Sequence, residues 1–222
     1  MENLTQIEKE AQEHRKIAQH EKEVAQKLKI NALTEIKKSK ARETLMNIEY
    51  KLADIKKDLA EKRNLLVNEK TEIKKNKILD FSEEELKIEK DYAVYNEKIA
   101  INQKEIAETN KKIALAEKQI AEQKLKLTKE KLNVVKARER LAKKQLAYIK
   151  IAKTQTSEDK VLKAKNNAEK QKEELVKQKN NALDSEKKVR KRENKLADLK
   201  KELSLKYSER EKIRHPGVIV AG

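Results

Sequence analysis

The sequence contains no cysteine, no tryptophan, one phenylalanine, one proline and two glycines among 222 residues. Without cysteine, disulfide bonds are excluded. The proline and both glycines lie within the last seven residues, so the rest of the chain lacks the two residue types on which tight turns most depend. This distribution argues against a compact globular fold and leaves long helices or a disordered chain.

Aromatic residues make up 3% of the chain and charged residues 43%, a balance that is compatible with disorder. The abundance of Lys, Glu, Ala, Leu and Gln, however, favours helices, because these residues have high helix propensity. The regular spacing of the apolar residues, described below, decides between the two in favour of helices.

Residue combinations that support catalysis or metal binding are also missing. No cysteine nucleophile is available, and no glycine-rich loop precedes a helix to hold phosphates. His14 and His20 are six residues apart, which does not place both on one face of a helix, and His215 stands alone near the end of the chain. We therefore expect no enzymatic activity, no cofactor, no metal site and no small-molecule substrate.

No apolar run approaches the roughly 20 residues of a membrane-spanning helix. The first residues, Met1 to Thr5, are polar and do not resemble a signal peptide. The expectation is a protein without a transmembrane segment that is located in the cytoplasm.

The most regular feature is a repeat of seven between residues 92 and 148. A large apolar residue stands at each step, and the next residue is usually alanine or another apolar group. The repeat consists of Tyr92, Ile99, Ile106, Ile113, Ile120, Leu127, Val134, Leu141 and Tyr148. Such a repeat, uninterrupted by glycine or proline, predicts a helix that buries this line against other helices of a coiled coil.

A similar repeat occupies the first part of the chain, where Leu45, Leu52, Leu59 and Leu66 form the predicted seam. Ile48 and Ile55 stand three residues after two of these leucines. Polar residues interrupt the preceding part of this line. Such residues either fix register and partner number or mark a loosely packed start of the helix.

The repeats break twice, and helix-start signals follow each break. Ser82 with Glu85 fits a capping box, and Phe81 could pack on Leu86. The second break, at residues 154–159, contains usable caps and an acidic first turn. A continuous helix that changes its buried face remains an alternative at the first break.

These signals predict an all-α, elongated coiled coil of two or three long helical segments with a short non-helical tail. The expected segments are 2–79, 83–154 and a basic helix at 158–213, followed by a tail at 214–222. Because the first two segments are similar in length, we expect them to form an antiparallel hairpin. The alternative is one rod, in which about 210 helical residues would span about 315 Å.

The tail differs from everything before it. Pro216 and Gly217 end the helix, and Val218, Ile219 and Val220 form part of a short apolar run with high β-propensity. Two interpretations stay open: a frayed terminus, or a segment that docks on a partner, for example as an added strand.

Positive charge is concentrated in the second half. Residues 1–123 carry 26 basic and 25 acidic residues, whereas residues 124–222 carry 30 and 14. A solvated helix face or a biased genome composition would explain many lysines, but not this one-sided excess. We therefore expect an anionic partner. The predicted contact residues are Lys124, Lys126, Lys129, Lys131, Lys136, Arg138, Arg140, Lys143, Lys144, Lys187, Lys188, Arg190, Lys191 and Arg192.

The function that follows is a non-enzymatic structural scaffold or adaptor, which self-associates or joins a larger complex and contacts an acidic partner with its basic half. The alternative is a protein that binds nucleic acid independently of its sequence, since lysines on a helix neutralise phosphates. A third option is a stalk in a motor or export machine. The chain is similar in composition to small lysine-rich antiparallel hairpins of flagellar export stalks, although no shared motif assigns it to a family.

Overall fold

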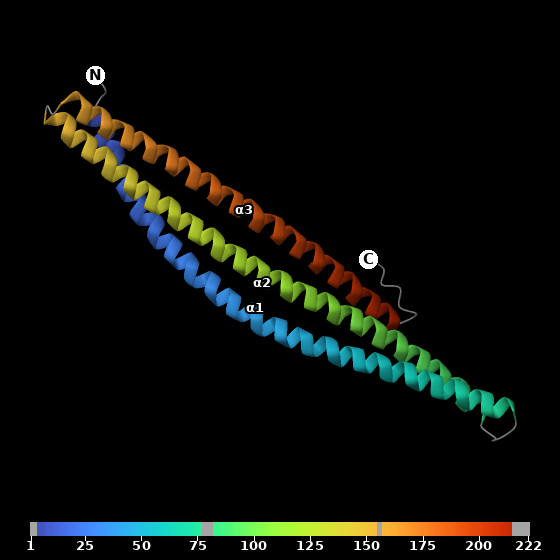
Figure 1. Cartoon of the computed structure of the whole chain (residues 1–222). Helices are drawn as coiled ribbons and strands as arrows, with labels where there is room; N and C mark the ends of the chain where they lie inside the picture. Colours follow the sequence, from blue (N-terminus) through green and yellow to red (C-terminus); the bar gives the residue numbers. More distant parts are fainter. Residues whose placement is uncertain (1–3, 77–81, 155–156, 215–222) are drawn as a thin grey trace. The chain divides into compact units, whose positions relative to one another are not determined.

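The computed structural model describes residues 4–76, 82–154 and 157–214, and it contains three long helices (Figure 1). Helix α1 spans Leu4–Lys75, α2 spans Glu83–Lys153 and α3 spans Glu158–Arg214. The described residues include no strand. The predicted all-α fold with three long helical segments is confirmed. The predicted tail residues Val218, Ile219 and Val220, together with Phe81, lie outside the described residues.

The residues at the predicted breaks begin the second and third helices. The backbone N–H of Glu85 donates to Ser82 Oγ at 3.5 Å, and the N–H of Leu86 donates to the Ser82 carbonyl at 3.1 Å. Three glutamates occupy the first turn of α2, where they interact favourably with the positive end of the helix dipole. At α3 the carbonyl of Ser157 accepts from the N–H of Lys160 at 2.9 Å. The Ser82 side chain therefore caps α2, and the Ser157 carbonyl accepts the first backbone hydrogen bond of α3.

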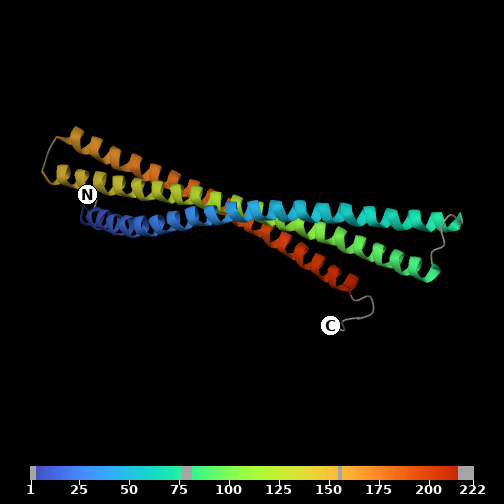
Figure 2. The ribbon, with the colours of Figure 1, turned by 90° about the horizontal axis from the view of Figure 1, so that it is seen from below.

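The chain forms two compact units, and these cut across the helices instead of following them. Unit 1 comprises residues 1–37 and 119–193, and unit 2 comprises residues 38–118 and 194–222. Each unit therefore contains one segment of every helix. Within unit 2, α2 lies between α1 and α3 in both ribbon views (Figures 1 and 2).

Helices α1 and α2 run antiparallel in both units. Cross-helix ion pairs establish the direction, because residue numbers rise in α1 as they fall in α2, with a sum that stays between 158 and 161. In unit 1 the pairs are Glu8–Lys153, Glu21–Arg138 and Glu35–Lys124. In unit 2 they are Glu43–Lys118, Asp54–Lys104 and Lys70–Glu89. The predicted hairpin is confirmed, and the single-rod alternative is wrong.

Small residues line the contact between the two helices. The buried line of α1 repeats every seven residues and consists of Ala11, Ala18, Ala25, Ala32, Ser39, Met46, Ala53, Ala60 and Val67. The matching buried line of α2 consists of Ala93, Ala100, Ala107, Ala114, Ala121, Thr128, Val135, Ala142 and Ile149. Because interaxial distance depends on the side chains at the contact, alanines allow the two helices to approach closely. We call these two rows the alanine lines.

The predicted leucine seam of α1 requires correction. Leu45, Leu52, Leu59 and Leu66 are 50–57% exposed, and Tyr92 at the start of the α2 repeat is 64% exposed. The residue after each leucine is buried instead. A row one residue later has the same sevenfold spacing, and the smaller side chains of that row permit the closer helix contact. Large side chains made the leucine row the expected seam, but side chains of that size would hold the two helices farther apart.

The large apolar residues of α2 lie inward along most of the helix. Ile106, Ile113, Ile120, Val134, Leu141 and Tyr148 are buried, whereas Ile99 and Leu127 are partly buried. In unit 1, α3 covers part of this row, since Leu175 and Ala182 pack against Val134, Ala137 and Leu141. In unit 2, Asn102 Nδ2 donates to the Lys206 carbonyl at 3.2 Å.

Candidate anion-binding surface

Unit 1 contains every residue of the predicted anion-contact set, because all fourteen lie between positions 124 and 192. Unit 1 carries 30 basic and 18 acidic residues, a net charge of +12. Unit 2 carries 26 and 21, a net charge of +5. Most of the excess positive charge of the chain thus belongs to unit 1.

One face of α2 in unit 1 exposes mainly cationic side chains. Of the side chains between positions 126 and 150, nine are exposed, and seven of these are basic while the other two are Asn133 and Ala147. We call the seven the basic stripe: Lys126, Lys129, Lys136, Arg140, Lys143, Lys144 and Lys150. Glu130 and Glu139 fall in the same interval but are partly buried. These two carboxylates are therefore less accessible than the seven cations.

The spacing of the stripe follows from the alanine lines. Positions 126, 133, 140 and 147 repeat every seven residues on the face of α2 opposite its alanine line, and positions 129, 136, 143 and 150 follow that line by one residue and lie on its flank. At a rise of 1.5 Å per residue, the 24 residues from Lys126 to Lys150 cover about 36 Å. None of the seven side chains forms an ion pair with a described residue. The stripe is a row of unneutralised positive charges.

The basic residues of α3 are only partly free. Arg190 pairs with Glu186 at 3.0 Å, and Lys187 lies 3.7 Å from Asp184. Arg192 donates to the side-chain oxygen of Gln119 at 2.7 Å. Lys188 and Lys191 are exposed and form no ion pair within the described part of the chain. The basic residues of α3 therefore include fewer cations without an intramolecular partner than the basic stripe does.

Arg138 is a correction to the predicted contact set. Its side chain is only 10% exposed, and it forms an ion pair with Glu21 of α1 at 3.0 Å. The repeat explains this, since position 138 lies among the inward residues Val134, Val135 and Leu141. Lys131 and Lys124 are partly buried, and Lys124 lies between Glu193 at 3.3 Å and Glu35 at 3.9 Å. Arg138 and Lys124 therefore already hold acidic partners within unit 1.

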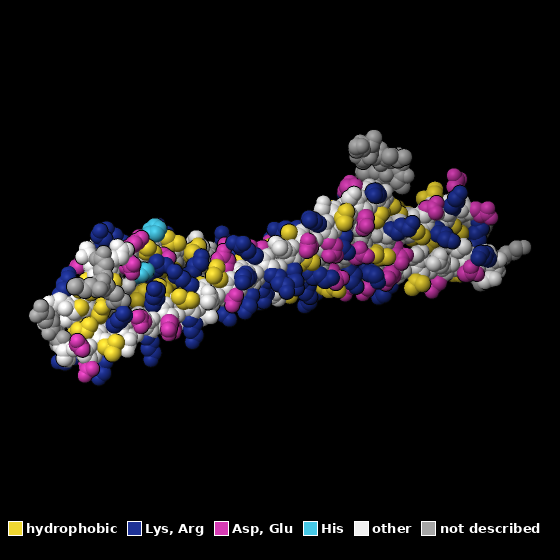
Figure 3. Space-filling view, turned by 90° about the horizontal axis from the view of Figure 1, so that it is seen from above, with side chains coloured by type: hydrophobic (Ala, Val, Ile, Leu, Met, Phe, Trp, Pro, Cys, Tyr) yellow, Lys and Arg dark blue, Asp and Glu magenta, His cyan; other side chains and the backbone are white. Residues whose placement is uncertain are grey.

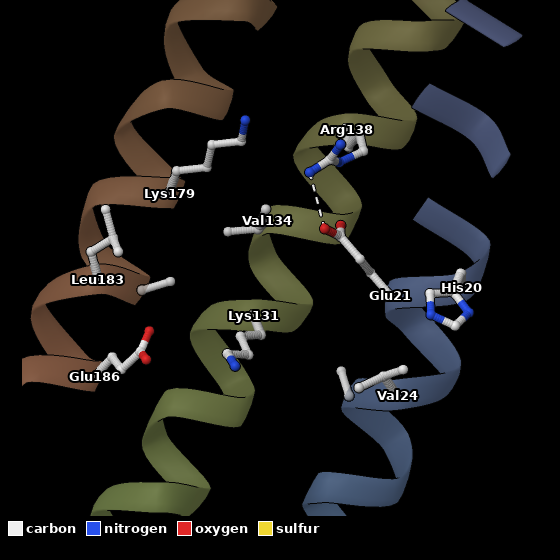
Figure 4. A pocket seen from close by; sticks show the side chains of 11 residues that line it. His20, Glu21, Val24, Lys131, Val134, Arg138, Lys179, Leu183 and Glu186 are labelled. Carbon is white, nitrogen blue, oxygen red and sulfur yellow. Dashed lines mark hydrogen bonds and ion pairs between the residues drawn. The ribbon is translucent and has the colours of Figure 1, made fainter. Parts of the chain in front are cut away.

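The Arg138–Glu21 pair lines a cleft of about 480 Å³ between the three helices of unit 1 (Figure 4). Val24 of α1, Val134 of α2 and Leu183 of α3 contribute apolar surface. Lys131, Lys179, Glu186 and His20 add charged and polar groups of both signs. The mixture of signs distinguishes the cleft from the stripe, where all charges are positive.

His14 of α1 is partly buried near this cleft. Burial lowers the pKa of His14 below its ordinary value, and the charges of Arg138 and Lys179 lower it further, while Glu10 and Glu13 act in the opposite direction. Its Nδ1 atom is buried and finds no hydrogen-bond partner among the described residues. His14 therefore favours the neutral form within the fold.

The described residues include no cluster of three or more His, Asp or Glu side chains that could hold a metal ion. Helices α1, α2 and α3 contain no stretch that is long and apolar enough to cross a membrane. The chemistry available to the basic stripe is the binding of an extended anionic surface by many weak charge contacts.

Sequence reasoning missed one member of the stripe. Lys150 continues the sevenfold series of Lys129, Lys136 and Lys143, so the repeat itself contained the signal. No sequence pattern indicated that Glu21 would pair with Arg138, because the two residues are 117 positions apart. Comparison of this chain with protein-family models, with curated proteins and with solved structures found no match.

Proposed function

We propose that the chain is a non-enzymatic helical scaffold or adaptor, and that unit 1 binds an acidic protein partner through the basic stripe. The observation that carries this proposal is the row of seven exposed cations, none of which forms an ion pair with a described residue. The antiparallel helices hold these charges in line, so an extended acidic surface can meet several of them at once.

An anionic partner also accounts for an arrangement that is unfavourable in isolation. Within the stripe, Lys136 and Arg140 are four residues apart, as are Arg140 and Lys144, and Arg140 and Lys143 are three apart. Like charges at these spacings destabilise a helix by roughly 0.2–0.5 kcal/mol per pair. A bound polyanion reverses this effect, because each cation then gains an opposite charge.

The composition of the stripe favours a protein partner over specific reading of nucleic acid. Six of the seven residues are lysines, which act as point charges, whereas recognition of bases favours the forked donors of arginine. No aromatic side chain is exposed among them to stack on bases. The stripe therefore suits an extended surface of repeated carboxylates, which lysines bind by charge alone.

Neutralisation of the stripe tests the proposal. We expect the variant in which all seven residues are replaced by Gln to bind poly-L-glutamate at least about tenfold more weakly than the wild-type chain, measured by fluorescence anisotropy in about 100 mM salt. The matched control replaces seven exposed lysines of unit 2 by Gln and removes the same charge: Lys38, Lys40, Lys87, Lys90, Lys98, Lys195 and Lys201. The control should retain binding within about threefold. Equal losses in both variants would show that only net charge matters and would contradict a dedicated surface.

Sequence-independent binding of nucleic acid is the second candidate. The length of the stripe favours it, since about 36 Å matches one turn of duplex DNA, about 34–36 Å. If seven phosphates are neutralised, the affinity for a random 20-base-pair duplex should fall about 10³- to 10⁴-fold between 50 and 200 mM salt. A duplex that binds more tightly than poly-L-glutamate, with this salt dependence, would favour the second candidate over the first.

A further inference from the structure

Helix α1 in unit 2 presents a row of large apolar residues that stay at least half exposed within the described part of the chain. Six side chains form it, with exposed fractions between 50% and 65%: Leu45, Ile48, Leu52, Ile55, Leu59 and Leu66. We call this row the open stripe. Exposed aliphatic patches of this length on a soluble protein generally mark contact surfaces. Hydrophobic side chains also remain visible between charged ones in the space-filling view (Figure 3).

The spacing within the open stripe alternates between three and four residues from Leu45 to Leu59. This is the pattern by which two helices bury a common seam in a coiled coil. The contact of α1 with α2 does not use it, because that contact consists of Met46, Ala53, Ala60 and Val67, all of them buried. The open stripe is thus a second apolar face of α1, and the hairpin forms without it.

Four charged residues flank the open stripe in an ordered way. Glu49 and Lys56 lie along one edge, and Lys51 and Asp58 lie along the other. All four are exposed, and no ion pair joins any of them to a described residue. Each edge therefore offers one positive and one negative group, seven residues apart. When the same edge of a second copy runs antiparallel to it, each positive group lies opposite a negative group.

We propose that the open stripe binds the open stripe of a second copy of this chain in antiparallel orientation, with facing apolar residues whose numbers add up to 107. Ile48 then packs against Leu59 of the second copy, and Leu52 packs against Ile55 of the second copy. Along the edges Glu49 meets Lys56, and Lys51 meets Asp58. Two-fold symmetry repeats every contact, which yields four apolar layers and four ion pairs.

A parallel pairing of the same helices is less favourable. In register it places Lys62, which occupies an interior position of the repeat, directly opposite its own copy, and it brings Lys51 beside Lys56. The antiparallel pairing instead places Lys62 near Leu45 at the end of the seam, where its ammonium group can reach water. The one like-charged edge contact is Arg42 with Arg63, and Arg42 is already held by Glu117 at 2.7 Å in its own chain.

Sedimentation velocity across a concentration series tests the association. We expect the wild-type chain to reach twice the mass of the 25.9 kDa monomer. Leu52→Asp should raise the dissociation constant of the dimer at least about 100-fold, because symmetry buries the charge twice. Ile30→Asp changes a residue of α1 that is 64% exposed outside the open stripe, and it should leave the dimer intact. A wild-type chain that stays monomeric up to about 100 μM would overturn the proposal.

Charge reversal tests the pairing of the edges. Glu49→Lys places lysine opposite Lys56 at two positions of the dimer and should weaken it by about tenfold. The double variant Glu49→Lys, Lys56→Glu restores opposite charges and should return the affinity to within about twofold of wild type. If Glu49→Lys weakened the dimer for a reason other than the loss of this ion pair, the second substitution would not restore the affinity. If the double variant is as weak as the single one, the proposed edge contacts are wrong.

Cysteine cross-linking tests the direction, on a chain that has no natural cysteine. In the antiparallel dimer, a mixture of Ile48→Cys and Leu59→Cys chains should form a disulfide-linked heterodimer under mild oxidation. Each variant alone should not, because the two copies of one residue lie about 16 Å apart along the helix. Efficient self-linkage of Ile48→Cys alone would indicate a parallel dimer and overturn the arrangement.

Discussion

The two units share the same three helices and the same alanine lines, but their surfaces differ. In unit 1 the exposed face of α2 carries seven cations without ion-pair partners. In unit 2, cross-helix ion pairs such as Arg42–Glu117 at 2.7 Å and Lys70–Glu89 at 2.9 Å join α1 to α2, and a further exposed feature is the apolar open stripe of α1. Helix geometry is therefore common to both units, whereas the residues on the outward positions determine whether a unit presents charge or apolar surface.

Larger side chains in the alanine lines should lower the stability of the fold equally in both units, because both units share this α1–α2 contact. Ala18→Leu in unit 1 and Ala114→Leu in unit 2 insert a large side chain at positions with 0% exposure. Overpacking of this kind typically costs about 1–3 kcal/mol. We expect both variants to lose stability in this range in urea unfolding followed by circular dichroism.

A neighbouring pair of residues supplies the control for that experiment. Ala60→Leu should destabilise the chain by a similar amount, whereas Leu59→Ala, one residue earlier and half exposed, should change stability by no more than about 0.5 kcal/mol. The measurement belongs at submicromolar concentration, where association through the open stripe does not contribute. A larger loss for Leu59→Ala than for Ala60→Leu would show that the leucine row, and not the alanine line, forms the contact.

The contribution of a cross-helix ion pair to the free energy of unfolding should depend on how deeply the pair is buried, and the two units offer one pair of each kind. Arg138→Met in unit 1 removes the partner of Glu21 from a site where the arginine side chain is 10% exposed. Because Glu21 remains 38% exposed, we expect a loss of about 1–2 kcal/mol instead of the 3–5 kcal/mol of a fully buried pair. Arg42→Met in unit 2, where the arginine is 47% exposed, should cost less than about 1 kcal/mol. Equal losses in urea unfolding would contradict this ranking.

The smallest expected effect is the pH dependence that His14 confers on unit 1. Its pKa is lowered in the folded chain, so the unfolded chain binds a proton first as pH falls. Stability should therefore decrease below the ordinary histidine pKa of about 6.5 and level off once the folded pKa is passed. His14→Gln should reduce this decrease between pH 7.5 and 5, whereas His20→Gln serves as the matched control. An unchanged pH profile for His14→Gln would exclude this residue as the cause.

Much of the fold was predictable because its determinants are local. The absence of glycine and proline before position 216, the sevenfold repeats and the caps at Ser82 and Ser157 predict three helices and their starts. The similar lengths of the first two segments suggested the hairpin. The basic residues of α2 were also visible in the sequence, apart from Lys150.

The sequence by itself thus determined where helices form and that α2 carries excess positive charge, because propensity, capping and composition act within a few residues of each other. Tertiary structure decided which of two adjacent rows is buried, Leu45 or Met46, since both rows have the same period. It also separated Arg138, which is buried against Glu21, from Lys136 and Arg140, which are exposed. The physical reason is the same in both cases: burial depends on how closely a second helix approaches, and the small side chains of both helices set that distance.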